Sequence, residues 1–319
     1  MEIVLLDQKS LGEKLNFDKL ESMGSVTYYD YTNQEQIIER CANAEVVITN
    51  KGHFDKVTIE ALSHLKLICM TGTGYDKIDV EAAKDKEIGV CNVLDYCSNS
   101  VAQHTLALVL QLVNHMNYYR DYVKSGKYIE DDAFTHYEVQ INEIAQMTWG
   151  IVGMGSIGGK VAKIAQAMGA KVIYYSTSGK NQQDAYERVN FDDLLKRADI
   201  ITIHAPLNDK TKDLFDEAAF SKMKKSAILV NVGRGDIVNE EALIKALKLD
   251  LIAGAALDVL SKEPMSKASK LIPMLEDSRL IITPHVAWAS ITARQKVIDE
   301  VAQNITEYVK GNSYQRVDV

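Results

Sequence analysis

Short apolar runs alternate with amphipathic helical segments along most of the chain, which is typical of parallel sheets covered by helices on both faces. In the first hundred residues, the apolar runs predict strands at 3–6, 26–29, 46–49, 67–70 and 90–93, and the helical periodicity predicts helices at 34–44, 55–63 and 80–86. Asp55 and Asp79 immediately precede apolar periodic stretches, so we expect both to be helix N-caps.

The alternation resumes after residue 148. Strands are predicted at 149–152, 171–175, 200–203, 227–232, 251–257 and 280–283, with helices at 160–168, 191–198, 217–223 and 240–249. A final helix at 292–310 lies beyond this second set, and we expect it to pack on the first.

The segment between the two sets has a different pattern. Ser100 and Gln103 match a capping box, which predicts one long helix over 101–124. Residues 125–146 are polar with little periodicity, and they fit either a loop or an arm that wraps a second subunit.

These patterns predict an α/β protein with two Rossmann-like or flavodoxin-like domains, doubly wound parallel sheets and a cleft between them. The predicted boundaries give a discontinuous domain at 1–97 plus 291–319, and a second domain at 98–290 that contains the glycine pattern described below. A chain of 319 residues is long enough for two cores of ordinary size.

Composition narrows the functional classes. A net charge of -8 argues against binding nucleic acid through a basic surface, and no apolar run approaches the ~20 residues of a membrane helix. The first residues do not resemble a signal peptide, so we expect a cytoplasmic protein that acts on small molecules. The four cysteines lack metal-ligand or disulfide-framework spacing and are expected to be reduced and mostly buried.

A glycine pattern, Gly153-Met154-Gly155-Ser156-Ile157-Gly158, joins a predicted strand to a predicted helix. The first glycine permits a tight turn, the second allows backbone N–H groups to approach a pyrophosphate, and the third brings helix and strand together. A phosphate-loop NTPase is excluded because Lys160 is followed by Val161, which has no hydroxyl for magnesium. A complete βαβ unit therefore predicts dinucleotide binding.

Three charged residues follow predicted strands or adjoin a proline: Arg234, Glu263 and His285. Each taken alone is more typical of a surface turn or a packing residue. Their shared location at the carboxyl ends of strands, where open α/β sheets bind ligands, favours a catalytic group. An arginine between two glycines can present its planar fork to a carboxylate.

The motifs 153–158, 231–235, 257–264 and 283–288 together resemble the D-isomer-specific 2-hydroxyacid dehydrogenases, in that family's order and over nearly the whole chain. The resemblance implies that Arg234 binds the substrate carboxylate, His285 is the acid/base and Glu263 is its partner. Thr73 and Gly74 would donate backbone N–H groups to the substrate, with Lys51 and Trp288 also lining the pocket.

The implied reaction is hydride transfer from NAD(P)H to C2 of a small 2-keto acid, giving a D-2-hydroxy acid, while protonated His285 donates to the carbonyl oxygen. An ordinary histidine is mostly neutral at neutral pH, and the Glu263 carboxylate would favour the imidazolium. The resemblance also implies a homodimer. The expected cofactor contacts are Gly153, Gly155, Ser156, Ile157, Gly158, Ser176, Thr177, Lys180, His204, Ala205, Pro206, Val232, Gly233, Asp258 and Val101.

The sequence departs from the family at two places. Ser176 stands where NAD-specific members carry an aspartate for the ribose hydroxyls, so NAD(H), NADP(H) or both are expected. Leu94-Asp95 replaces the family's Pro-Gly. A dinucleotide-sensing binding module of the corepressor kind is the alternative function, because such proteins share the fold and the three charged residues.

Overall fold

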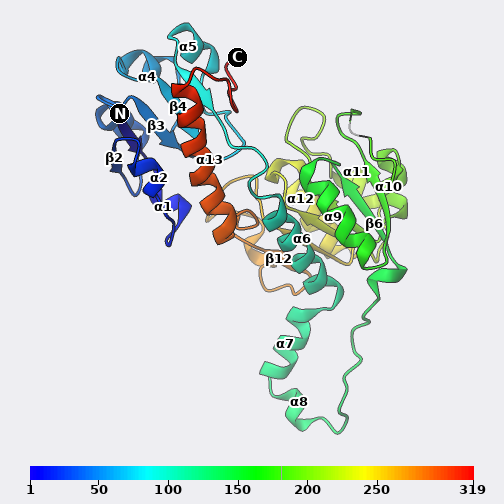
Figure 1. The fold of residues 1–319 in the computed structure, drawn as a ribbon. Helices are drawn as coiled ribbons and strands as arrows, with labels where there is room; N and C mark the ends of the chain where they lie inside the picture. Colours follow the sequence, from blue (N-terminus) through cyan, green and yellow to red (C-terminus); the bar gives the residue numbers. More distant parts are fainter. Residues whose placement is uncertain (181) are drawn as a thin grey trace. The chain divides into compact units, whose positions relative to one another are not determined.

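The computed structural model describes residues 1–180 and 182–319, which form two units, residues 1–97 with 289–319 and residues 98–288. Each unit is built on one parallel sheet with helices packed against it (Figure 1). The predicted α/β class is therefore confirmed.

The sheet of the first unit has the strand order β2-β1-β3-β4-β5, which is the flavodoxin-like order. Its central strands are buried throughout, as a sheet covered on both faces requires. The strands are β1 (Glu2–Leu5), β2 (Ser25–Tyr28), β3 (Val46–Thr49), β4 (Leu67–Met70) and β5 (Gly89–Cys91).

Helices cover both faces of this sheet. One face packs with α3, α4 and α5, and the other packs with α1, α2 and the C-terminal α13, whose Val297, Val301 and Ile305 are buried. Asp55 and Asp79 are N-caps as predicted, since each carboxylate accepts a backbone N–H of its helix. The helices are α1 (Gln8–Leu11), α2 (Asp18–Glu21), η1 (Gln34–Gln36), α3 (Ile37–Cys41), α4 (Lys56–Ala61), α5 (Val80–Asp85) and α13 (Ile291–Val309).

The sheet of the second unit has the order β12-β11-β10-β9-β6-β7-β8. Strand order reverses between β6 and β9, and that switch point is where such sheets bind dinucleotides. The strands are β6 (Thr148–Val152), β7 (Lys171–Tyr175), β8 (Glu187–Arg188), β9 (Ile200–Ile203), β10 (Ile228–Asn231), β11 (Gly254–Leu257) and β12 (Leu280–Ile282).

A large apolar core of this second unit includes Leu195, Phe220 and Leu243 from helices of the unit, and Phe215 from the segment before α11. The helices of the unit are α6 (Ser98–Val113), α7 (Met116–Lys124), α8 (Lys127–Glu130), η2 (Ile144–Gln146), α9 (Ser156–Ala167), α10 (Phe191–Arg197), α11 (Glu217–Lys222), η3 (Gly235–Ile237), α12 (Glu240–Lys248) and η4 (Ile272–Met274).

The single long helix predicted at 101–124 is wrong. His115 adopts a left-handed conformation with φ of 49° and separates α6 from α7. The capping box is also wrong, because α6 begins at Ser98 and the Ser100 hydroxyl donates instead to the carbonyl oxygen of Ala287. The Ser100 hydroxyl, which the capping-box pattern assigned to a helix cap, thus forms a tertiary hydrogen bond instead.

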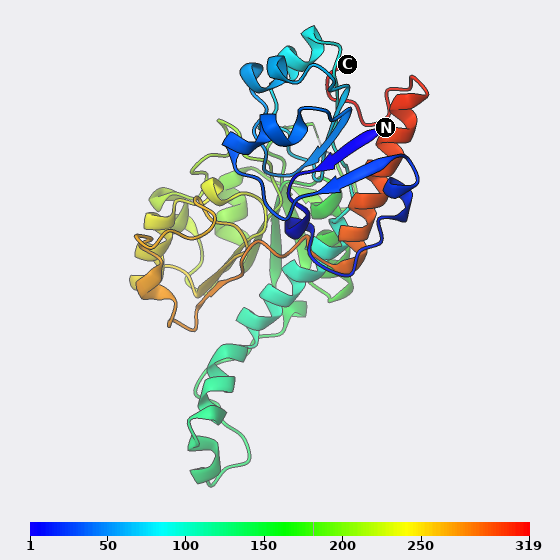
Figure 2. The same ribbon diagram turned by 90° about the vertical axis from the view of Figure 1, so that its left-hand side faces the viewer.

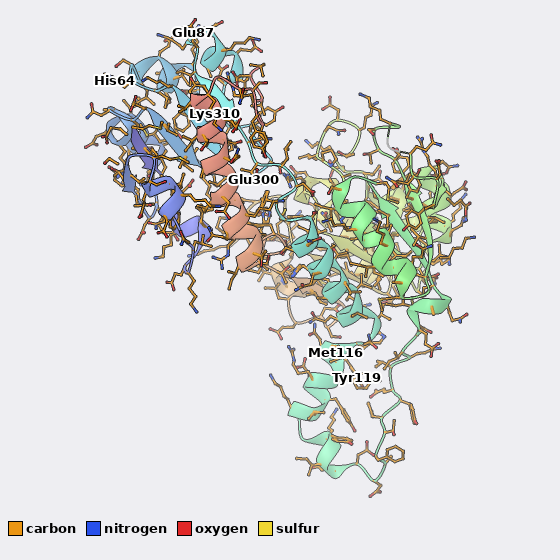
Figure 3. The ribbon with its side chains drawn as sticks, in the orientation of Figure 1. His64, Glu87, Met116, Tyr119, Glu300 and Lys310 are labelled. Carbon is orange, nitrogen blue, oxygen red and sulfur yellow. The ribbon has the colours of Figure 1, made fainter. Side chains whose placement is uncertain are left out.

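Residues 116–141 form an arm in which α7 and α8 follow the end of α6 and an extended segment returns to the unit (Figures 1 and 2). Tyr118 and Tyr122 stack on His136, and Tyr118 donates a hydrogen bond to Glu138. Figure 3 shows Met116 and Tyr119 on this arm. Its side chains line a groove of about 880 Å³, among them Tyr119, Tyr122, Tyr128, Phe134, Tyr137 and Ile141.

Most other differences from the predicted elements are shifts of one or two residues at their ends. The prediction missed α1, α2 and the two-residue strand β8, and the segment predicted as helix 34–44 begins with a 3₁₀ turn. Cys41, Cys69 and Cys91 are buried, as expected. Across the described residues, none of the helices combines the length and apolarity needed to cross a membrane.

Candidate active site

The first glycine of the dinucleotide motif is required by its conformation and by its neighbours. Gly153 directly follows β6 and has φ of 92°, in the region that favours glycine. A Cβ there would lie 2.9 Å from the backbone of His204 and Ala205 at the end of β9. The turn after β6 and the turn after β9 therefore meet backbone to backbone at the switch point.

The other two glycines differ in what they permit. A Cβ on Gly155 would meet no atom within 4 Å, so the backbone there is open to a ligand. A Cβ on Gly158 would lie 2.1 Å from the carbonyl oxygen of Gly153, so that position brings α9 against the turn. The N-cap of α9 is Gly155, which has no side chain to cap the helix, and the positive dipole end of a helix attracts an anion.

Two polar side chains beside this turn are buried without a hydrogen-bond partner among the described residues. They are Ser176, through Oγ, and His204, through both ring nitrogens. Burial lowers the pKa of His204 to about 3, so the imidazole is neutral. Because buried polar groups are normally hydrogen-bonded, these atoms fit a site completed by a bound ligand. The residues present therefore fit a dinucleotide cofactor.

The turn that carries Arg234 is held by the buried side chain of Asn231. Its Oδ1 accepts the Gly233 N–H at 3.0 Å, and its Nδ2 donates to the Arg234 carbonyl at 2.9 Å. The Arg234 guanidinium is exposed, and its Nη1 donates to the carbonyl oxygen of Gly233 at 2.9 Å. The backbone is fixed while the cationic fork faces outward, which suits capture of a carboxylate.

Gly235 links the Arg234 turn to the loop that carries Glu263. A Cβ on Gly235 would lie 2.0 Å from the carbonyl carbon of Leu260, so only glycine fits. The backbone N–H of Leu260 in turn donates to Oε1 of Glu263 at 2.9 Å. Backbone packing thus fixes the loop that carries Glu263 against the turn that carries Arg234.

The predicted pair of His285 and Glu263 is present. Nδ1 of His285 lies 2.7 Å from Oε2 of Glu263, and both side chains are partly exposed. Burial opposes ionisation of Glu263, but the hydrogen bonds from His285 and from Leu260 N–H outweigh it and lower the pKa of the carboxyl. Glu263 is therefore a carboxylate, and it orients the imidazole through Nδ1.

Asp258 organises the turn that carries His285. Its carboxylate is buried and accepts the backbone N–H groups of Val286 and Ala287, each at 2.9 Å, and the hydroxyl of Thr283. Burial alone would raise the pKa of Asp258, but the hydrogen bonds from His104, Thr283 and the two backbone N–H groups lower it. Its predicted cofactor contact stays a prediction, since these bonds give it a positioning role.

The backbone of His285 itself is in a left-handed conformation, with φ of 54°. Its N–H lies 2.9 Å from the carbonyl oxygens of both Asp258 and Thr283. Non-glycine residues adopt this region at a cost, and they keep it where the surroundings fix it. Here the Asp258 carboxylate holds the residues that follow, so the turn directs the imidazole toward Glu263.

The remaining residues that were predicted to contact the cofactor or the substrate differ in how exposed they are. Val101 is buried within α6, and Ala205 and Val232 are buried at the ends of β9 and β10. Pro206 and Lys180 are exposed, while Ile157, Thr177 and Trp288 are half-buried and Ser156 is the first residue of α9. Their roles toward cofactor and substrate stay predictions.

Three predicted substrate residues, Lys51, Thr73 and Gly74, belong to the first unit. The Lys51 N–H donates to Asp7 at 2.8 Å, and the Thr73 hydroxyl donates to the carbonyl oxygen of Val93 at 2.9 Å. Gly74 is exposed. These hydrogen bonds fix the local backbone, and the roles of the three residues toward a substrate stay predictions.

No individual role was predicted from the sequence for Asn231, His104 or Thr283. Nε2 of His104 lies 3.5 Å from Asp258 and 3.1 Å from the hydroxyl of Thr283. Asn231 and Thr283 lie within the motifs already described, at the last residue of one strand and just after another. Their position could have been noticed, but neutral side chains give no charge signal, and His104 is far away in sequence.

Residues 106–287 match the family described as D-isomer specific 2-hydroxyacid dehydrogenase, NAD binding domain. The chain belongs to the D-isomer specific 2-hydroxyacid dehydrogenases. This family supports an oxidoreductase that uses a nicotinamide dinucleotide, and its two-domain fold is the one observed here.

Similar proteins in this family extend over nearly the whole chain. A hydroxypyruvate reductase of Blautia hydrogenotrophica is 33% identical over 98% of this chain and 98% of its own. A glycerate dehydrogenase of Methylorubrum extorquens is 35% identical over 97% and 96%. The solved structure of an acyclic imino acid reductase, Bsp5, in complex with NADPH and D-Arg is 30% identical, with a TM-score of 0.85 and coverage of 99% and 100%.

We predict that Asp258→Asn destabilises the protein at neutral pH by about 1–3 kcal/mol, because an amide cannot accept both backbone N–H groups and the hydroxyl. The pKa of Asp258 is lowered in the folded state, so its contribution is present above the unfolded-state value of about 3.9 and is lost as the pH falls further. Urea unfolding measured as a function of pH should show the difference from the parent shrinking in acid. Asp209→Asn, at an exposed aspartate, is the control, and equal effects of the two variants would refute the role of Asp258.

Proposed function

We propose that the protein reduces small 2-keto acids, such as hydroxypyruvate and glyoxylate, with a reduced nicotinamide dinucleotide in a reversible reaction. The product is a 2-hydroxy acid, and it is the D isomer wherever C2 becomes a stereocentre, as it does with hydroxypyruvate. The observation that carries the proposal is the hydrogen bond of 2.7 Å between His285 and Glu263, on a loop packed backbone to backbone against the Arg234 turn. The names of the hydroxypyruvate reductase and glycerate dehydrogenase relatives support this substrate class.

The residues divide the reaction between them. The Arg234 guanidinium binds the substrate carboxylate as a bidentate pair and places C2 and its carbonyl. His285, protonated and held through Nδ1 by Glu263, donates a proton from Nε2 to the carbonyl oxygen as it becomes a hydroxyl. When bound, the reduced nicotinamide supplies the hydride that reaches C2. The glycine turn at 153–158 and the N-terminus of α9 would hold its pyrophosphate.

Glu263 has a defined electrostatic role in this proposal. Its carboxylate is ionised over the working pH range, since its pKa is lowered, and a nearby negative charge favours the imidazolium that must donate the proton. Because the proton donor is regenerated from solvent in each turnover, the pH range of reduction depends on how strongly this carboxylate stabilises the cation.

The exposed apolar side chains of the arm support a homodimer. Ile129 is 88% exposed and Phe134 is 92% exposed, on a segment that also carries the 82% exposed Tyr137. Apolar side chains gathered on one exposed segment mark an interaction surface rather than a solvated loop. We propose that this arm packs against a second copy of the chain.

We predict that His285→Ala lowers kcat by about 10²–10⁴ in keto-acid reduction, because the proton donor is removed. Affinity for the dinucleotide, measured by calorimetry, should be unchanged. The assay is oxidation of NADH and NADPH with glyoxylate, hydroxypyruvate, pyruvate and a branched keto acid. His64→Ala, at an exposed histidine labelled in Figure 3, is the control. Cofactor binding with no turnover of any keto acid by the parent protein would overturn the proposal and favour a binding module.

Glu263→Gln should move the basic limb of the pH profile for reduction to lower pH, because a neutral amide no longer stabilises the positively charged proton donor. The profile of kcat against pH gives this shift directly. Glu241→Gln, at an exposed glutamate paired with Lys270, should leave the limb in place. An unmoved limb in Glu263→Gln would remove Glu263 from this role.

For the arm, we expect the double variant Ile129→Lys and Phe134→Asp to halve the mass measured by size-exclusion chromatography with light scattering, because charges would replace the apolar contacts between copies. Val57→Asp, at an exposed apolar residue of the first unit, is the control and should stay dimeric. A monomeric parent protein, or a double variant that remains a dimer, would refute the arm as the interface.

A further inference from the structure

The turn after β7 lacks the carboxylate that would bind ribose hydroxyls and repel a phosphate. Ser176 occupies that position and is 6% exposed, with its Oγ unpartnered among the described residues. The turn is closed by the Gly179 N–H, which donates to the Ser176 carbonyl at 3.3 Å, and Gly179 has φ of 73°. A buried hydroxyl without a partner at this edge of the sheet indicates that a ligand completes it.

A cation reaches the same turn from an element that the sequence did not predict. The short strand β8 pairs in parallel with β7, with Arg188 beside Tyr174. Nη2 of Arg188 lies 3.8 Å from the position that a Cβ on Gly179 would occupy. The Arg188 guanidinium therefore lies against the turn that begins with Ser176.

The guanidinium of Arg188 is left for a ligand. The neighbouring carboxylate, Glu187, is bound by Arg197 at 2.6 and 2.7 Å and lies 3.7 Å from Lys171. The Arg188 side chain is exposed and forms no hydrogen bond or ion pair within the described part of the chain. Lys180 adds a second positive charge on the turn, and its backbone N–H is fixed by the Ser178 hydroxyl at 3.2 Å.

We propose that Arg188, with Lys180 and the hydroxyl of Ser176, forms a binding site for the 2′-phosphate of the adenosine ribose, so that the protein prefers NADPH to NADH. An arginine fork matches a phosphate through two parallel hydrogen bonds, which a lysine cannot do. The absent carboxylate removes the repulsion that would discriminate against the phosphate. The proposal rests on the dinucleotide site of the proposed function and deepens it.

The test uses calorimetric binding of adenosine fragments to the full chain, because it needs no turnover. Adenosine 2′,5′-bisphosphate should bind at least about tenfold more tightly than adenosine 5′-monophosphate, as expected for one charge-assisted contact. Arg188→Ala should remove most of this ratio and leave the affinity for the monophosphate unchanged. Ser176→Asp should reverse the preference. Lys171→Ala, which removes a charge at the opposite end of β7, is the matched control and should leave the ratio as it is.

Three results would overturn the proposal. These are equal affinity of the parent protein for the two fragments, an Arg188→Ala variant that keeps the ratio, or adenosine 3′,5′-bisphosphate binding as tightly as the 2′,5′ isomer, which would show unspecific attraction of phosphate. A protein that shows the predicted ratio but reduces no keto acid would retain this site and lose the proposed reaction. The two proposals therefore fail separately.

Discussion

The close approach of backbone segments at the carboxyl edge of the seven-stranded sheet is the constraint on which the site depends. Gly153 leaves no space between the turn after β6 and the end of β9, and Gly233 would place a Cβ 3.0 Å from the carbonyl oxygen of Ala205. Gly235 abuts Leu260 in the same way. Four loops are thus fixed by contacts in which a methyl group would clash, so the residues between the glycines have defined positions without a large core of their own.

The charged groups use this frame in two different ways. Both carboxylate oxygens of the buried Asp258 accept hydrogen bonds from backbone or hydroxyl donors. The carboxylate therefore stabilises the turn in which His285 adopts its left-handed conformation. The accessible Glu263 has one oxygen on a backbone N–H and the other on the imidazole. A buried carboxylate needs internal donors to remain charged, whereas a half-exposed one retains enough hydration to act on a neighbour that exchanges protons.

The features that could be predicted from the sequence are those that depend on residues near one another in the chain. Buried parallel strands are continuous apolar runs, so 46–49, 67–70, 171–175 and 200–203 were located to the residue, and the Arg234, Glu263 and His285 motifs led to a real hydrogen-bonded pair. The failures share a cause. Ser100 bonds to Ala287 rather than capping a helix, and His115 interrupts a helix whose local pattern is continuous. Ser100 and Ala287 are distant in sequence, and Nε2 of His115 likewise lies 3.1 Å from the carbonyl oxygen of Gln140. Periodicity does not contain such contacts.

The same limit explains why Arg188 escaped notice. A two-residue strand has no periodicity, and an arginine among the polar residues 182–190 resembles any solvated charge. The position of Arg188 is set by strand pairing, because β8 lies beside β7 and places the guanidinium at the turn after β7. Ser176 and His204 differ from the hydrogen-bonded pair of Glu263 and His285 in having buried polar atoms that no described group satisfies. Described groups satisfy the Glu263 carboxylate and Nδ1 of His285, but not Oγ of Ser176 or the ring nitrogens of His204. Ligand binding is therefore expected to order the surroundings of Ser176 and His204 more than it orders His285.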